Sequence, residues 1–302
     1  MIANISWRKS LKSSSMMGDA FTPHQLAADI HTIHDIFAAF FAQLIEADWQ
    51  RLTEPNGWTL HQTVAHLDAV AGAYQQTIEA ILSYRQVDFD REGVYQREDL
   101  PRWNEEQIAV RLKRPIPDLC TSFLATLQTA AVSAAHRQAA ELPQTHIFPV
   151  YNSSMTLAQL YGGQAAHPGF VHAAQVAKGA NRPPLWQQYP PDLLQRQITR
   201  FLHLMSLSYW PQRGQMHTTI NLVVPRRASW HLRLSLEGCE AYEGKGERPS
   251  LTLWFRSLEA LSRSFTLQAS PLRAILTGQV LAWGNLSLAF RLNTLFDPTG
   301  IV

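Results

Sequence analysis

Three histidines in this sequence could bring imidazole rings to one ligand. His66 lies in the stretch from Gly57 to Asp68 (GWTLHQTVAHLD), whereas His167 and His172 lie much later in the chain. An imidazole can bind a metal ion, accept a proton, or simply hydrogen-bond a neighbouring backbone group. Three imidazoles with one open coordination position would suit a catalytic zinc or nickel ion. Whether the three rings meet depends on the elements that carry them.

The stretch around His66 has the pattern of an amphipathic helix. Its apolar residues recur at helical spacing along one face: Leu60, Val64, Leu67, Ala71, Tyr74, Ile78 and Ile81. Thr59 can cap this helix, because its hydroxyl can accept a hydrogen bond from a first-turn N–H. His66 is about 100° from Leu67 around the helix. We therefore expect His66 at the edge of the apolar face, pointing into a groove between helices and still partly solvated.

His167 and His172 lie towards the end of another predicted helix, which starts at Ser154 or Thr156. Residues i and i+5 are about 140° apart on a regular α-helix, so these two rings could not both face one ion. Pro168 removes a backbone hydrogen bond, and with Gly169 it favours a kink or a π-bulge. Two outcomes are open. Either a bulge returns His167 to the face of His172, or the site is degenerate and His167 points away.

Other polar residues near these positions are assigned no chemistry. His61 is about 140° from His66 on the same helix and is expected to be exposed. Asp68 is expected to be exposed or to cap a neighbouring group. Four further histidines have no spacing that defines a ligand set, so structural or surface roles are expected for them: His31, His34, His136 and His146.

Four long helices are predicted in the first half of the chain, where a bundle would hold its sites between facing helices. The first helix is expected to begin at Thr22-Pro23 and to have buried residues as far as Ile45, and the second to run from Trp58 to Tyr84. The third is expected to follow Pro115 and Pro117 and to fade by Glu141, and the fourth to run from Ser154 or Thr156 to Val176. The polar crossover between the second and third helices is too long for a simple bundle turn. Within it, residues 103–106 are expected to begin a short helix.

From residue 192 the pattern changes from helix to mostly strands. Asp192 is expected to cap a helix over 193–205, after which apolar and polar residues alternate. Strands are expected at 220–224, 230–236 and 251–255, with a short helix at 257–261. A strand, a Gly284-Asn285 turn and an apolar helix then follow over 277–296. On the strand 230–236, Arg233 belongs to the face that should be solvated.

Length and composition indicate a globular protein with two domains. A chain of 302 residues with 46% hydrophobic and 17% charged residues can bury two cores. The expected divisions are a disordered leader (1–18), a bundle (19–180), a proline-rich linker (181–191) and a second domain (192–302). The net charge of +2 gives no general case for nucleic acid or a membrane surface, although residues 190–302 carry 12 Lys/Arg against 7 Asp/Glu.

The two cysteines and the hydropathy pattern indicate the cellular compartment expected for this protein. Cys120 and Cys239 form no Cys-x-x-Cys pattern, so a disulfide framework is not expected and a reducing cytoplasm is the default. No run of about 18 apolar residues is present, so no membrane span is expected. The prediction is a cytoplasmic protein.

The spacing from Trp58 to His66-Leu67 resembles the DinB-like superfamily of four-helix bundles. In that superfamily the second helix opens with Trp-Ser/Thr and places a metal-binding His-Leu eight residues after the tryptophan. The fourth helix ends with a His or Glu, three spacers, a His, two spacers and a Gln or Asp. His172 and Gln175 match this pattern, whereas Pro168 occupies the first ligand position and the nearest histidine is His167.

This superfamily includes mycothiol-dependent maleylpyruvate isomerases, bacillithiol transferases and the helical domain of ergothioneine synthases. The resemblance implies a divalent metal, zinc or nickel, bound by His66, His172 and His167. It also implies a low-molecular-weight thiol that the metal presents as a thiolate to an electrophilic substrate. The function expected on this basis is a thiol-dependent transferase or isomerase.

Residues 192–298 resemble the sterol-carrier-protein domain, in which a Gly-Asn or Gly-Asp turn precedes an apolar last helix. Here Gly284-Asn285 is followed by the pattern Leu-Ala and Leu-x-x-Leu-Phe. The resemblance implies an apolar tunnel for an acyl chain or a sterol-like lipid. Mycothiol-dependent maleylpyruvate isomerases also join a DinB-like bundle to a C-terminal domain of this kind.

The predicted fold is therefore α+β: a four-helix bundle followed by a smaller α/β domain with a mostly antiparallel sheet and flanking helices. The alternative to an enzyme is a non-enzymatic acyl-chain or lipid carrier whose metal site is degenerate. A homodimer is a further expectation.

Overall fold

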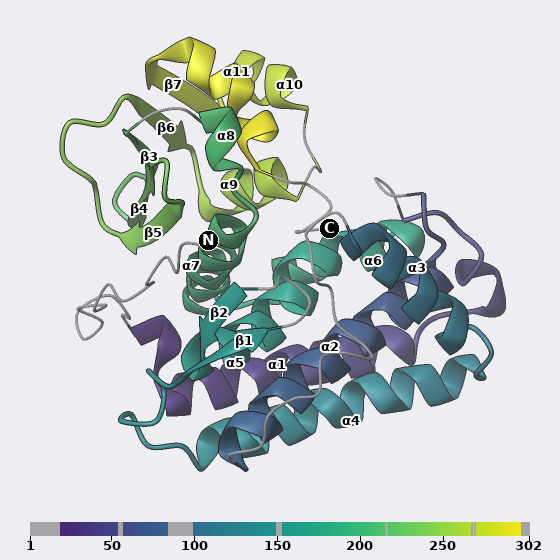
Figure 1. The fold of residues 1–302 in the computed structure, drawn as a ribbon. Helices are drawn as coiled ribbons and strands as arrows, with labels where there is room; N and C mark the ends of the chain where they lie inside the picture. Colours follow the sequence, from purple (N-terminus) through teal and green to yellow (C-terminus); the bar gives the residue numbers. More distant parts are fainter. Residues whose placement is uncertain are drawn as a thin grey trace, which may run out of the picture.

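A computed structural model of the chain describes residues 19–53, 57–83, 99–148, 153–214, 217–266, 268 and 270–296. The predicted leader and about the first half of the predicted crossover lie outside these residues. The described part forms a helical bundle followed by a sheet with flanking helices (Figure 1), which confirms the predicted α+β class. None of the described helices combines the length and hydropathy that a membrane span requires.

The bundle is built from helices that the sequence pattern predicts. Its long members are α1 (Pro23–Phe41), α2 (Leu60–Leu82), α4 (Ile116–Ala135) and α5 (Leu157–Ala166), and α5 continues through a π-helical turn (His167–His172) into α6 (Ala173–Gly179). The shorter α3 (Leu100–Arg111) packs on α2, as do α4 and α5. Short 3-10 turns lie at Asp19–Phe21 (η1) and Glu46–Asp48 (η2).

The start of α1 agrees with prediction and its end does not. The Thr22 side chain accepts from the Gln25 backbone N–H, and Pro23 occupies the first turn. The helix ends at Phe41, however, and the predicted core residue Ile45 is 62% exposed. The prediction failed here because apolar residues continue at helical spacing as far as Ile45, beyond the residue at which the helix ends.

A small two-stranded sheet, β1 (Thr145–Phe148) with β2 (Ser153–Thr156), was not predicted. Each strand has four residues and a largely polar sequence, so neither carries a readable alternation. The pair nevertheless positions the bundle, because the Phe148 ring stacks on Tyr74 of α2 with ring centroids 4.3 Å apart.

The second sheet has the strand order β5-β4-β3-β6-β7. Its strands are β3 (Thr218–Val224), β4 (Ala228–Leu234), β5 (Cys239–Glu243), β6 (Leu251–Phe255) and β7 (Val280–Gly284). All neighbours are antiparallel except β3 and β6, which confirms the mostly antiparallel prediction. The helices around it are α8 (Pro211–Gly214), α9 (Leu258–Phe265), α10 (Pro271–Leu276) and α11 (Leu286–Leu295). β5 was not predicted, because its five residues include too few apolar side chains to show an alternation.

The face of β4 that was predicted to be solvated is covered in part. His231 is buried, with its ring stacked on Tyr242 at 4.9 Å between centroids. The chain around Gly246 crosses this face, where its backbone N–H and C=O both hydrogen-bond the Asn221 side chain. Arg233 is exposed, as expected, and Leu236 lies outside the strand.

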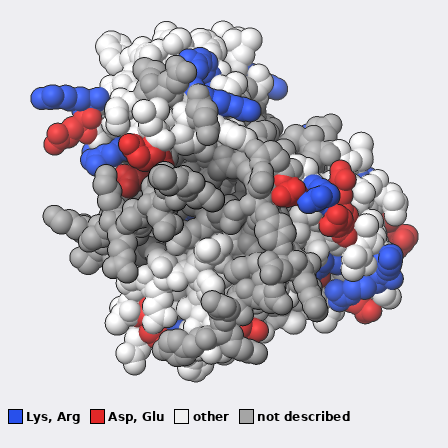
Figure 2. Space-filling view, in the orientation of Figure 1, with Lys and Arg blue, Asp and Glu red and all other residues white. Residues whose placement is uncertain are grey.

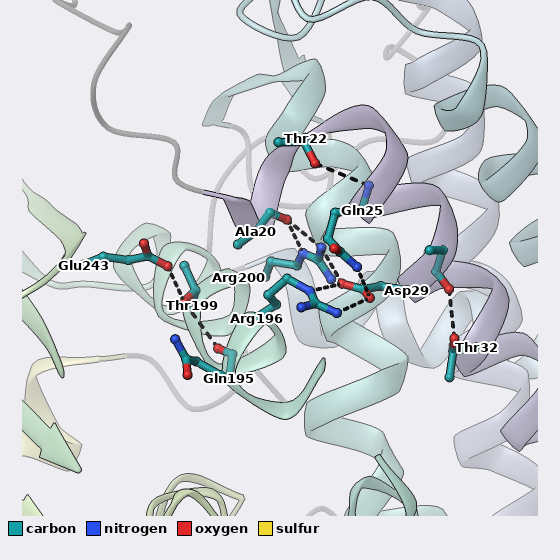
Figure 3. Close-up of polar contacts among 11 residues, drawn as sticks. Ala20, Thr22, Gln25, Asp29, Thr32, Gln195, Arg196, Thr199, Arg200 and Glu243 are labelled. Carbon is teal, nitrogen blue, oxygen red and sulfur yellow. Dashed lines mark hydrogen bonds and ion pairs between the residues drawn. The ribbon is translucent and has the colours of Figure 1, made fainter. Parts of the chain in front are cut away.

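Helix α7 (Pro191–Leu207) joins the bundle to the sheet (Figure 3). Towards the bundle, Arg196 makes two 2.7 Å bonds to the Asp29 carboxylate, and Arg200 Nη2 lies 2.8 Å from the same group. Towards the sheet, the Thr199 hydroxyl donates to Glu243 at 3.0 Å and accepts from the Trp230 indole N–H at 2.8 Å. Both halves of the chain therefore share this helix.

The sequence predicts Asp192 as the N-cap of α7, and this prediction is wrong. The residue before the helix is Pro190, and Asp192 lies in the first turn, where it pairs with Arg227. The preceding segment also forms a 3-10 turn, η5 (Leu185–Gln188), with Leu185 and Trp186 buried. The predicted linker is therefore partly helical and partly buried.

The charged residues on the face shown in Figure 2 are mixed. Lys and Arg stand beside Asp and Glu over both parts of the described surface in this view. This face therefore presents no continuous basic patch among its described residues.

Candidate metal centre

His66 lies on α2, and neither of its ring nitrogens has a hydrogen bond of good geometry with a described residue. The helix begins with a reciprocal capping box, in which Thr59 accepts from the Gln62 N–H and Gln62 Oε1 accepts from the Thr59 N–H. His66 is 3% exposed, which corrects the expectation that it would stay partly solvated. Both Nδ1 and Nε2 are buried without a hydrogen-bond partner. Such orphaned nitrogens are costly unless another ligand satisfies them.

The turn His167–His172 decides between the two outcomes that the sequence left open. It is π-helical, so the extra residue per turn carries His167 round to the side of His172. Pro168 has no N–H for the regular ladder, which favours this wider turn. Gly169 lets the turn pack closely, because a Cβ there would lie 2.7 Å from Cδ1 of Ile33. The Gly169 carbonyl accepts from the Tyr189 hydroxyl at 2.7 Å.

The three imidazoles converge from α2 and the π-helical turn. Ring centroids are 4.4 Å apart for His167 and His172, 5.2 Å for His66 and His167, and 5.0 Å for His66 and His172. One nitrogen from each ring lies within 4.8 Å of the other two. The Nε2 atoms of His167 and His172 are 3.1 Å apart. Two nitrogens bound tetrahedrally to zinc would be about 3.3 Å apart, so the donor set fits such an ion.

Gln175 orients one of these rings. Its Oε1 lies 2.5 Å from Nδ1 of His172, and both side chains are buried. If that nitrogen carries the proton, the lone pair of Nε2 faces the other two histidines. Gln175 was matched to the family pattern from the sequence, and the structure places it where such a residue would hold the tautomer.

Burial keeps all three rings neutral. It lowers the pKa of His172 to about 4 and the pKa values of His66 and His167 well below 6.5, with the neighbouring imidazoles adding to the effect on the latter two. A neutral imidazole is the form that binds a metal ion. The group is therefore ready for a cation at neutral pH.

Asp68 corrects another expectation, because it is buried and paired. Its Oδ2 accepts from Arg111 at 2.9 Å and from Arg114 at 3.2 Å, which ties α2 to α3 and to the start of α4. The side chain of Asn104 on α3 acts on His66 in the direction that raises its pKa, opposing burial. Sequence reasoning missed Asn104 and Arg111 as neighbours of the site, since their contacts depend on how α3 docks.

The remaining histidines lie outside this cluster. His61 is half-buried, with its ring 6.5 Å from the centroid of Trp49. His31 and His34 lie with Asp35 on the outer side of α1, where their ligand atoms are also within 4.8 Å of one another. This second group is largely exposed. Its spacing of i, i+3 and i+4 places the three side chains on one face of a helix, and this spacing could have identified the group from the sequence.

Neither cysteine is a candidate nucleophile. Both are free thiols, and burial raises the pKa of Cys120 to about 12 and that of Cys239 further above its usual range. A thiol of this kind carries almost no thiolate at neutral pH.

The fold and the buried histidine triad together define a class: a helical bundle with a metal-type site, followed by a sheet domain. Residues 30–177 match the family model described as the mycothiol maleylpyruvate isomerase N-terminal domain. This match supports the DinB-like resemblance of the helical part.

Solved structures resemble the chain over most of its length. The crystal structure of the mycothiol-dependent maleylpyruvate isomerase has a TM-score of 0.59 at 10% identity and covers 88% of this chain and 95% of that one. A histidine-to-alanine mutant of that isomerase has a TM-score of 0.55 at 10% identity, covering 82% and 90%. At such identity the likeness is one of fold. No curated protein sequence matches the chain.

The resemblance of residues 192–298 to the sterol-carrier domain has no support from these matches and stays a prediction.

Proposed function

We propose that this protein is a metal-dependent transferase or isomerase that uses a low-molecular-weight thiol, with the ion held by His66, His167 and His172. The observation that carries the proposal is that both His66 ring nitrogens are buried without a hydrogen-bond partner among the described residues, and that one of them lies within 4.8 Å of a nitrogen from each of two further buried imidazoles. The described residues supply no carboxylate to this buried group of three neutral histidines, and such a group has few structural uses. Zinc or nickel would suit three imidazoles with one open position.

A divalent ion bound there would lower the pKa of a coordinated thiol and hold it as a thiolate at neutral pH. The protein's own residues prepare this site. Gln175 fixes the ring of His172, the Trp58 ring packs 4.9 Å from that of His66, and burial excludes bulk water. These contacts orient the donors before any ligand arrives.

The thiol must come from outside the chain in this proposal, because Cys120 and Cys239 are held as protonated thiols. The solved structure with the same fold is that of a mycothiol-dependent enzyme, which supports a small thiol as the co-substrate class. The second substrate would be an electrophile that accepts the thiolate at carbon.

Lipid binding is a second candidate, and a specific feature of the second half favours it. Large apolar side chains are exposed on α10, β7 and α11, among them Leu276 at 77%, Trp283 at 80% and Phe290 at 77%. Such surfaces commonly bind apolar partners. A carrier of acyl chains would bind a fluorescent fatty acid with micromolar affinity, and would do so equally well when His66 is replaced.

Metal content distinguishes the two candidates. Protein purified without a polyhistidine tag and dialysed against zinc or nickel should hold close to one tightly bound ion per chain by elemental analysis. His66→Ala, His167→Ala and His172→Ala should each abolish it. His61→Ala should retain the ion, and His31→Ala controls for binding at the exposed cluster on α1. A wild-type protein that stays free of both metals would eliminate the transferase proposal in favour of the carrier.

A further inference from the structure

A cleft of about 540 Å³ lies where η5, α7 and the sheet meet. Among its lining residues, Val224 ends β3, and Arg256 directly follows β6, the strand parallel to it. The start of α9, which follows β6, contributes Leu258 and Glu259 to the lining, and the start of α7 contributes Pro191 and Leu194. The cleft thus lies beyond the carboxyl ends of two parallel strands, a common place for ligands in open sheets. Its volume is within the range of small-molecule sites.

The charges that line this cleft leave one arginine unpaired. Arg227 is paired with Asp192, and Glu259 is paired with Arg263 at 2.8 Å. Arg256 also lines the cleft and makes no ion pair with any described residue. A guanidinium at the wall of a cavity, without a counter-charge, is suited to bind an anion.

Apolar residues form the other part of the lining, and most of them are buried with only a small exposed surface. They are Trp186, Tyr189, Leu194, Val224, Pro225 and Leu258. The indole N–H of Trp186 is buried without an acceptor, whereas the Tyr189 hydroxyl is already bonded to the Gly169 carbonyl. The cleft therefore combines an arginine that no described residue pairs with and some apolar surface, and none of the three metal-site histidines lines it.

We propose that this cleft is a binding site for a small organic carboxylate with an aromatic or branched apolar body. The carboxylate would bind the Arg256 guanidinium, and the apolar body would pack against the parts of Tyr189, Leu194 and Leu258 that reach the cleft surface, with the fully buried Trp186 close by. An inorganic anion would use only the first contact, and a neutral apolar molecule only the second. The site does not depend on the metal function proposed above.

Benzoate is a suitable probe, with benzyl alcohol and sulfate as the two partial ligands. In protein labelled with ¹⁵N-tryptophan, the indole signal that disappears in Trp186→Phe should shift on titration with benzoate. The signal assigned to the distant Trp283 by the same approach should not move. Benzyl alcohol and sulfate should each bind at least about tenfold more weakly than benzoate, since each lacks one of the two contacts.

Arg256→Gln should weaken benzoate binding about tenfold or more, the loss expected for a charge-assisted hydrogen bond. The matched control is Arg273→Gln, which removes an exposed arginine outside the cleft and should change nothing. His66→Ala should bind benzoate like the wild type, so failure of the metal site would leave this result intact. Equal affinity of the wild type and Arg256→Gln for benzoate, or no shift of the Trp186 signal at millimolar benzoate, would overturn the proposal.

Discussion

The hydrogen bond from His172 to Gln175 offers a quantitative test of the proposed metal site. Gln175→Met keeps much of the side-chain volume but removes the amide oxygen that lies 2.5 Å from Nδ1. Partners that orient a metal-bound histidine typically contribute 10–100-fold in metal affinity. We therefore expect the zinc dissociation constant to rise by about that factor, or about 1.4–2.7 kcal/mol. The metal-free protein should also lose about 1–3 kcal/mol of stability, because a buried N–H is left unsatisfied.

The assay is competition with a fluorescent zinc chelator, together with urea unfolding of the metal-free protein. Gln164→Met is the matched control, since Gln164 lies on the same helical segment, is equally buried and has no hydrogen-bond partner at either end of its amide. This variant should keep its zinc affinity within about twofold and be as stable as the wild type or more so. Zinc affinity unchanged in Gln175→Met would refute the idea that this amide orients a ligand, whatever happens to stability.

Two further predictions concern stability. Asp29→Asn should cost about 3–5 kcal/mol in urea unfolding, because it leaves the fully buried Arg200 guanidinium without its counter-charge; a loss below 1 kcal/mol would contradict this. Burial lowers the pKa of His203 to about 4, so between pH 6.5 and pH 4 the unfolded chain binds the extra proton and stability falls as pH falls. At pH 5 this loss is about 2 kcal/mol relative to pH 7.5. His203→Leu should lack that part of the pH dependence in parallel urea titrations, and an unchanged pH profile would exclude the assignment.

The sequence alone was sufficient for elements whose signals are local. The Thr22-Pro23 start of α1, the Thr59 cap of α2 and the strand alternation of β3, β4 and β6 depend on neighbours within a few residues, so periodicity and capping rules reach them. The resemblance to a family pattern, rather than these rules, implied His66 and His172 as ligands, because both match that pattern within single helices. These rules identified the conflict at Pro168, and the two ways it could be resolved.

Only the tertiary structure decided whether His167 turns towards His172 or points away from it. The π-turn forms where Gly169 packs against Ile33 of α1 and its carbonyl meets Tyr189, contacts made by residues far apart in the chain. Asp68 shows the same limit, since its burial depends on Arg111 and Arg114 arriving from α3 and the start of α4. Spacing along one helix defines a direction in space. It does not determine which residues of other elements will lie there. The packing of those residues around the π-helical turn is what brings the three histidines together.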